Sequence, residues 1–331
     1  AACVLPIELW PYFAFRRRAI AARYRTKYPD TPLVAEVLAR VRGGAVTAND
    51  LGGARDGKSG WWSWSHAKNA LELLYMRGEL ACVTRRRWQR VYDVPERAIP
   101  SALLAQNLDD ATCYRHLVGI AARALGVGTA RDIGDYFMLC TPYAGGMPGG
   151  RKMVDRAIEE IGLVPVRVEG WDDPAFAHPD ALADETRTGS RTTLLSPFDS
   201  LIWAPRQRME RLFGMAMKLE AYTPKHQRVH GYFSMPVLAD NRLVGRVDPA
   251  REDGALVARY VSIEEADAVP PIAAALREAA SWVAATDIRI ERVVPKKLAP
   301  ELKRALSNSV APHGGSRSST KSRTRRAGSA S

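Results

Sequence analysis

The sequence has few cysteines, and they lie far apart. Of the 331 residues, only Cys3, Cys82, Cys113 and Cys140 are cysteine, and no two of them have C-x-x-C spacing. The six histidines show no metal-ligand spacing either. This pattern argues against a disulfide framework and against a zinc site, and it favours a reducing compartment. We therefore expect no zinc ion.

Long hydrophobic runs are also missing. No apolar stretch reaches the roughly 18–20 residues that a membrane helix needs. The first 18 residues are apolar first and basic second, which is the reverse of a secretory signal. These features predict a protein of the cytoplasm with no membrane contact.

Acidic residues are scarce at the C-terminal end. Residues 308–331 contain arginine and lysine but no aspartate or glutamate, and the whole chain has a net charge of +12. A basic body with a basic tail favours a polyanionic partner. The alternative is a basic protein without such a partner.

Residues 57–94 have the pattern of a groove-binding helix followed by a basic hairpin. Ala67, Ala70, Leu71 and Leu74 form an amphipathic stripe, and Gly78 suits the left-handed end of a helix. Residues 79–84 and 89–94 are typical of two strands around an arginine-rich turn. Together they predict the recognition helix and wing of a winged helix. The nearby Trp61, Trp62 and Trp64 could stack on bases, but we expect them in the core.

Candidate DNA contacts lie on this helix and wing. Lys68 and Asn69 are on its polar face, where they would contact phosphate or base edges or simply face solvent. Arg85, Arg86, Arg87 and Arg90 crowd the hairpin, and their mutual repulsion would be relieved by an anion. The other interpretation is a basic hairpin without a ligand.

The same order of elements is expected twice. Before the helix of residues 67–78, Pro32 opens a helix that runs to Arg42, and Thr47 caps a short helix. Later, Asp109 or Asp110 caps a helix to Leu125, residues 130–137 form a second helix, and a third follows Gly149 and Gly150. The third helix begins with Arg151 and Lys152, where the helix N-terminus also attracts phosphate. Residues 163–168 predict the first strand of a second wing, and residues 170–190 a surface loop.

The C-terminal third differs in character. Residues 232–238, 242–247, 256–263 and 288–294 alternate as strands, and an alanine-rich helix with Ile272, Leu276, Ala279 and Val283 inward packs on them. The predicted fold is α+β: tandem winged-helix domains, then a small strand-rich C-terminal α+β domain and a disordered basic tail. The expected segments are a remnant of a preceding N-terminal domain (1–29), a winged helix (30–100), a second winged helix (101–170), the C-terminal domain with its initial loop (171–306), and the tail (307–331).

Several motifs carry a family resemblance. They include Leu-Leu-Ser-Pro-Phe-Asp-Ser-Leu-Ile-Trp at 194–203, Leu-Glu-Ala-Tyr-Thr-Pro at 219–224, Gly-Tyr-Phe at 231–233 and Leu-Val-Gly-Arg-Val-Asp at 243–248. With Gly60-Trp61-Trp62 and Gly78-Glu79-Leu80, they resemble the tandem winged-helix DNA glycosylases of the YcaQ/AlkZ type. That family unhooks interstrand crosslinks and excises bulky alkylated purines, which implies damaged or crosslinked double-stranded DNA as the partner of a monomeric protein.

The resemblance also implies a catalytic motif, Gln-apolar-Gln or Gln-apolar-Asp, that positions the hydrolytic water. Because side chains alone activate that water, the resemblance implies neither a metal ion nor an organic cofactor. None of Gln89, Gln106, Gln207 and Gln227 has Gln or Asp two positions later. We therefore expect this chain to be a fragment that binds DNA without cleaving N-glycosidic bonds. Asp199, in the strongest motif, is either a carboxylate at the rim of the active site or the cap of the turn before Leu201.

Two other functions are compatible with the same sequence. The first is a non-enzymatic winged-helix regulator or architectural protein, which would usually be a dimer on two half-sites. The second is a scaffold fragment without affinity for nucleic acid.

Overall fold

The computed structural model describes residues 5–27, 30–52, 65–140, 149–183, 191–203 and 206–307. The chain divides into two compact units. The first consists of Ala1–Thr188 with Phe198–Lys218, and the second of Gly189–Pro197 with Leu219–Ser331. Trp61, Trp62 and Trp64, and the tail after Ser307, lie outside the described residues. No described helix combines the length and apolarity needed to cross a bilayer.

The described part of the first unit begins with two 3-10 turns (Ile7–Leu9 and Pro11–Phe13) and helix α1 (Ala14–Lys27). Phe15 is fully buried and packs at 4.8 Å, centroid to centroid, against the ring of Tyr114. Arg16 donates to the carbonyl of Phe137. Helix α1 is thus held against residues 101–170, far along the chain.

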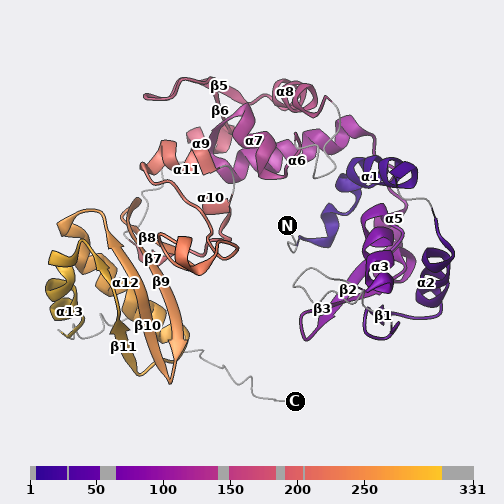
Figure 1. Cartoon of the computed structure of the whole chain (residues 1–331). Helices are drawn as coiled ribbons and strands as arrows, with labels where there is room; N and C mark the ends of the chain where they lie inside the picture. Colours follow the sequence, from indigo (N-terminus) through magenta and orange to yellow (C-terminus); the bar gives the residue numbers. More distant parts are fainter. Residues whose placement is uncertain are drawn as a thin grey trace, which may run out of the picture. The chain divides into compact units, whose positions relative to one another are not determined.

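Residues 30–100 form helices against a small antiparallel sheet (Figure 1). The strands pair in the order β1-β3-β2, with β3 in the middle. Val37, Val41, Leu71, Leu74 and Leu80 are buried in the core that the helices and strands share. The elements are α2 (Pro32–Arg42), β1 (Val46–Thr47), α3 (His66–Arg77), β2 (Ala81–Arg86), β3 (Gln89–Asp93), α4 (Pro95–Ala98) and α5 (Ser101–Leu104).

The predicted helix after Thr47 is wrong. Thr47 is in strand β1, opposite Val91, and residues 48–51 form a turn. The backbone N–H and the hydroxyl of Thr47 both donate to the Asp50 carboxylate, at 2.6 and 2.8 Å. The Asp50 side chain therefore closes a turn with Thr47. Such side-chain-to-backbone hydrogen bonds compete with helix formation at the same residues.

Residues 101–183 repeat this arrangement. Their strands also pair antiparallel in the order β4-β6-β5, with the last strand in the middle. Cys113, Leu117, Val118, Ile133 and Ile158 lie in their core. The elements are α6 (Asp110–Leu125), β4 (Val127–Thr129), α7 (Ala130–Tyr136), α8 (Gly150–Glu160), β5 (Val164–Val166), β6 (Ala175–Ala177) and α9 (Pro179–Ala183).

The helix starts in this segment follow local capping. Asp109 accepts the N–H of Thr112, and Thr129 with Asp132 forms a reciprocal capping box at the start of α7. The predicted surface loop at 170–190 needs correction, because residues 175–177 form strand β6 between β4 and β5. Residues 184–190 lie outside the described residues.

Two further helices belong to the first unit: α10 (Ser200–Trp203) and α11 (Arg206–Phe213). Arg208 donates to the carbonyls of Leu125 and Val127, at 3.1 and 3.2 Å. Arg211 pairs with the buried carboxylate of Asp132. These contacts join α11 to the end of α6 and the start of α7.

The second unit is a curled sheet against helix α12 (Val269–Trp282) (Figure 1). The strand order is β11-β10-β9-β8-β7, and β12 also pairs with β10. Ile272, Leu276 and Ala279 are buried under the sheet as predicted, and Val283 is partly buried. The remaining elements are β7 (Thr192–Leu194), a 3-10 turn (Lys225–Gln227), β8 (Met235–Ala239), β9 (Arg242–Glu252), β10 (Ala255–Ile263), a 3-10 turn (Ala266–Ala268), β11 (Asp287–Ile290), β12 (Val293–Val294), a 3-10 turn (Lys296–Leu298) and α13 (Ala299–Ser307).

Several strands differ from the prediction in extent. Strand β2 (Ala81–Arg86) lies two residues later than the predicted 79–84, and strand β8 begins at Met235 rather than at residue 232. Strand β9 continues past Val247 to Glu252, and Pro249 pairs with Ala258 where the register shifts. A proline is tolerated inside a sheet at such an irregularity. The single strand predicted for 288–294 is two strands, β11 and β12, that pair with successive parts of β10.

Candidate nucleic-acid interface

Helix α3 has a well-defined start and end. Ser65 accepts the backbone N–H of Lys68 at 3.3 Å, and Gly78 ends the helix with a left-handed φ of 79°. Leu71 and Leu74 are buried, Asn69 is exposed and Lys68 is half-buried. The helix therefore presents a polar face with the two residues that the sequence predicted there.

The hairpin of β2 and β3, which we call the basic wing (Ala81–Asp93), is fixed to helix α3 by one carboxylate. Glu72 of α3 accepts from Arg90 at 2.7 and 2.5 Å and from the hydroxyl of Tyr92 at 2.8 Å. Arg90 also lies 5.2 Å from the ring of Tyr75. Burial raises the pKa of Tyr92, and the Glu72 carboxylate adds to the effect. Arg90 therefore serves as an anchor of the wing to the helix.

We expect Glu72→Gln to lower the free energy of unfolding by about 1–2 kcal/mol, because charge-assisted hydrogen bonds of a part-buried group are lost. The measurement is denaturant unfolding of the full chain. Asp155→Asn is the matched control, since Asp155 and Arg151 are half exposed to solvent and exposed pairs contribute under about 1 kcal/mol. Equal losses for the two variants would contradict the anchoring role of Glu72.

The other three arginines of the wing differ from Arg90. Arg85, Arg86 and Arg87 are exposed, and none of them forms a salt bridge with any residue that the structure describes. Arg85 lies opposite Arg90, and Arg86 lies opposite Gln89, next to the tip. Three exposed guanidinium groups thus gather at the end of a hairpin whose base is anchored, and one of them, that of Arg86, interacts with the Asp50 carboxylate without forming a salt bridge. Such an array repels itself until an anion binds.

The corresponding parts of residues 101–183 have a different charge. Arg151 and Lys152 are exposed in the first turn of α8, as predicted, but Arg151 pairs with Asp155 at 2.9 Å. Residues 167–174, between β5 and β6, contain one arginine and three acidic residues: Arg167, Glu169, Asp172 and Asp173. This second hairpin would repel phosphate.

Asp199 caps helix α10. Its carboxylate accepts the N–H of Leu201 at 2.8 Å, and its carbonyl accepts the N–H of Ile202 at 3.0 Å. Of the two roles that the sequence allows Asp199, these contacts are those of the turn cap. We assign it no role in chemistry.

Sequence reasoning missed a surface in the second unit, the loop of residues 219–233. Tyr222 is 80% exposed and Tyr232 is 50% exposed. Arg228 stacks 5.0 Å from the ring of Tyr232, and Lys225 is exposed nearby in the chain. Exposed tyrosines beside cations are a combination that nucleic-acid surfaces use. The sequence signal that could have indicated this surface is Tyr-Thr-Pro at the end of the 219–224 motif, followed directly by Lys225.

Two buried carboxylates hold this loop. Glu220 accepts the N–H groups of Val229 and His230, at 2.9 and 2.8 Å. Asp248 of β9 accepts those of Tyr232 and Phe233, at 3.0 and 2.9 Å. Burial opposes the charge of Glu220, but the backbone donors outweigh it and the pKa of Glu220 is lowered. The loop is therefore pre-organised by hydrogen bonds to ionised groups.

A family model described as DNA glycosylase AlkZ-like matches residues 1–285. The chain belongs to the AlkZ-like DNA glycosylase family. Among solved structures, the DNA glycosylase AlkZ of Streptomyces sahachiroi matches with a TM-score of 0.54 and 19% identity, over 88% of this chain and 78% of that one. At that identity the second match shows a shared fold.

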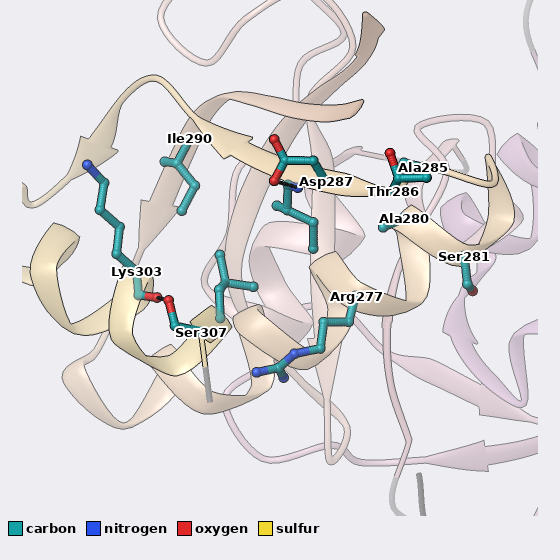
Figure 2. Close-up of a pocket in the computed structure, with 11 residues that line it drawn as sticks. Arg277, Ala280, Ser281, Ala285, Thr286, Asp287, Ile290, Lys303 and Ser307 are labelled. Atoms are coloured by element: carbon teal, nitrogen blue, oxygen red, sulfur yellow. Dashed lines mark hydrogen bonds between the residues drawn. The ribbon is translucent and has the colours of Figure 1, made fainter. Parts of the chain in front are cut away.

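The second unit contains a pocket. Neither the basic wing nor the loop 219–233 contributes a residue to its lining. It has a volume of about 670 Å³ and lies between α12, α13 and β11, as Figure 2 shows. Arg277 in its lining donates to the carbonyl of Ala305, and Asp287 accepts from the N–H of Ile288 at 2.8 Å. These polar groups have partners within the protein, so we assign the pocket no ligand. Among the described residues no cluster of histidine, cysteine or acidic side chains could hold a metal ion.

His230 gives the second unit a predicted dependence on pH. Burial and then the charge of Arg246, against the weaker opposing charges of Glu220 and Glu264, lower the pKa of His230 below its ordinary value. Arg246 lies 2.8 Å from its Nε2, and because a guanidinium only donates, this contact requires neutral imidazole. The unfolded chain therefore binds the proton more readily than the folded one. The contribution of neutral His230 to the free energy of unfolding is therefore fully present above about pH 6.5. It is lost as the pH falls below that value.

The test is hydrogen exchange of strands β8 and β9 at pH 7.5 and 5.5, corrected for intrinsic rates. We expect the protection lost at pH 5.5 to be retained in His230→Gln, which still offers Arg246 an acceptor. His116→Gln is the control, because His116, whose pKa burial also lowers, belongs to the first unit. An unchanged pH effect in His230→Gln would contradict this assignment.

Proposed function

We propose that this chain binds double-stranded DNA through the basic wing, within a pair of winged-helix modules at residues 30–100 and 101–183. The observation that carries the proposal is the set of exposed guanidinium groups of Arg85, Arg86 and Arg87 on a hairpin anchored by Glu72. Phosphate is the ligand that such an array neutralises best. Family membership supports DNA as the polyanion. The proposal includes a damaged or crosslinked form of that DNA and a location at the nucleoid.

The two modules have different roles in this proposal. The repeated strand order, with the last strand central in each sheet, supports two modules of one kind. Only the first wing is basic, so it contacts phosphate together with Lys68 and Asn69 of α3. The second module, whose hairpin is acidic, holds α1 and α11 in place, and Arg151 and Lys152 add a weaker contact. Hydrolysis is not part of the proposal, because no glutamine of this sequence lies in the motif that the resemblance implies.

The test is a titration of a short duplex with the full chain at several salt concentrations, followed by fluorescence anisotropy. The expected result is binding as a monomer with a log–log salt slope of about −0.9 for each phosphate contact. No binding at low salt would overturn the proposal. A dimer in light scattering with a sequence-specific footprint would favour a winged-helix regulator instead.

A further inference from the structure

The tip of the basic wing carries an exposed tryptophan. Trp88 is 89% exposed, the highest value for any large apolar side chain that the structure describes. An indole in water does not contribute the free energy that its burial would give, and the described contacts of the fold do not involve the Trp88 ring. An indole this exposed at the tip of a hairpin is accessible to a partner over both ring faces.

The backbone at the tip is strained in the same place. Arg86 pairs with Gln89, so Arg87 and Trp88 are the two central residues of the turn. Both have positive φ, 46° and 68°, in the left-handed region. Asparagine and glycine are preferred at these positions of a two-residue hairpin turn, because other side chains are strained there. The wing thus has an arginine and a tryptophan at two positions where asparagine or glycine would make a more stable turn.

The surroundings of Trp88 favour nucleic acid as the partner. Arg85, Arg86 and Arg87 are exposed beside it, and an aromatic ring among arginines is how proteins stack on bases while holding the backbone. Tryptophan and arginine also occur in protein interfaces, but three exposed guanidinium groups that form no salt bridge with described residues favour a polyanion. Because Glu72 anchors the hairpin, its tip is held in position before DNA binds.

We propose that Trp88 stacks on a base at an interruption of the double helix, so that the basic wing prefers a gapped or locally unpaired duplex over a continuous one. In a continuous duplex the base faces are covered by their neighbours, and only edges are open in the grooves. An indole can stack on a base only where the stacking between two neighbouring base pairs is interrupted. This inference rests on the proposed function, since the wing must first bind DNA.

The experiment compares the full chain on two duplexes of one sequence, continuous and with a one-nucleotide gap, by fluorescence anisotropy. We expect about 5- to 100-fold tighter binding to the gapped duplex, the range that base–aromatic stacking gives. Trp88→Ala should remove this preference and change binding to the continuous duplex by less than about twofold, since the phosphate contacts remain. Trp88→Phe should keep most of the preference, because it keeps a ring.

Two further variants control for damage to the hairpin. Trp88→Gly removes the ring but suits the positive φ, so the turn is retained and the preference should still be lost. Trp282→Ala removes another exposed tryptophan, in the second unit, and should leave the preference unchanged. A preference that survives in Trp88→Ala and Trp88→Gly overturns the inference, as does a wild-type chain that binds both duplexes equally. Binding to neither duplex overturns the proposed function as well.

Discussion

Replacing Arg85, Arg86 and Arg87 by glutamine is expected to weaken binding of a short duplex by about 10- to 1,000-fold at low salt. These guanidinium groups are exposed and form no salt bridge with described residues, so their loss removes phosphate contacts and breaks no ion pair of the fold. The log–log salt slope should become less steep by about 0.9 for each contact removed. The measurement is anisotropy across a series of salt concentrations.

The matched control removes the same charge elsewhere. Lys296, Lys297 and Lys303 are exposed residues of the second unit, and their change to glutamine lowers the net charge equally. We expect that variant to lose less than about threefold in affinity, because only the long-range field changes. If both triple variants lose affinity equally, net charge rather than the basic wing holds the DNA.

The same assay separates the two modules. Arg151→Gln with Lys152→Gln is expected to cost less than the wing variant, about two- to fivefold, because Arg151 already pairs with Asp155 and the hairpin after α8 is acidic. A loss as large as that of the wing variant would assign the main phosphate contacts to the second module.

Gly231→Ala is expected to cost about 3–5 kcal/mol of stability in the second unit. Gly231 has a φ of 107°, which L-residues rarely adopt, and an added Cβ would overlap the carboxylate of Asp248. Relieving that overlap displaces the acceptor of two backbone N–H groups, those of Tyr232 and Phe233. Loss of hydrogen bonds to a buried charged acceptor adds to the backbone strain. The measurement is denaturant unfolding followed by a probe of the second unit.

Gly254→Ala is the control for the strain alone. Gly254 has a φ of 77°, but nothing lies within 4 Å of the place that its Cβ would take. We expect a cost of about 1–2 kcal/mol there, from the positive φ alone. Similar costs at the two positions would show that the close approach to Asp248 does not matter. The glycine of the Gly-Tyr-Phe motif would then be required for its backbone conformation only.

Elements with local determinants were predictable from the sequence. Thr31 and Pro32 define the start of α2, Asp109 that of α6, and Gly78 the end of α3. Each is a capping residue whose effect depends on neighbours within a few positions. The family resemblance was equally accessible, because it lies in short motifs of contiguous residues, and the family model confirms it.

Several strands of two or three residues were not predictable, although β5 (Val164–Val166) lies within the strand predicted at 163–168. Strands β1, β6 and β7 are too short for an alternating pattern, and each exists because it pairs with a distant strand. The extension of β9 through Pro249 likewise depends on an irregular pairing with β10. Such pairings are decided by the assembled sheet rather than by local propensity.

By itself, the sequence determined that arginines crowd one hairpin and that this hairpin follows an amphipathic helix. Only the tertiary structure separated Arg90, bound to Glu72, from Arg85, Arg86 and Arg87, which extend along the exposed strand and turn. The tertiary structure also showed that Arg87 and Trp88, in the predicted turn, both have positive φ. Arg-Trp is not a sequence that predicts that conformation. The physical reason is that residue type sets what a side chain can bind, whereas its nearest opposite charge is set by how distant segments fold together.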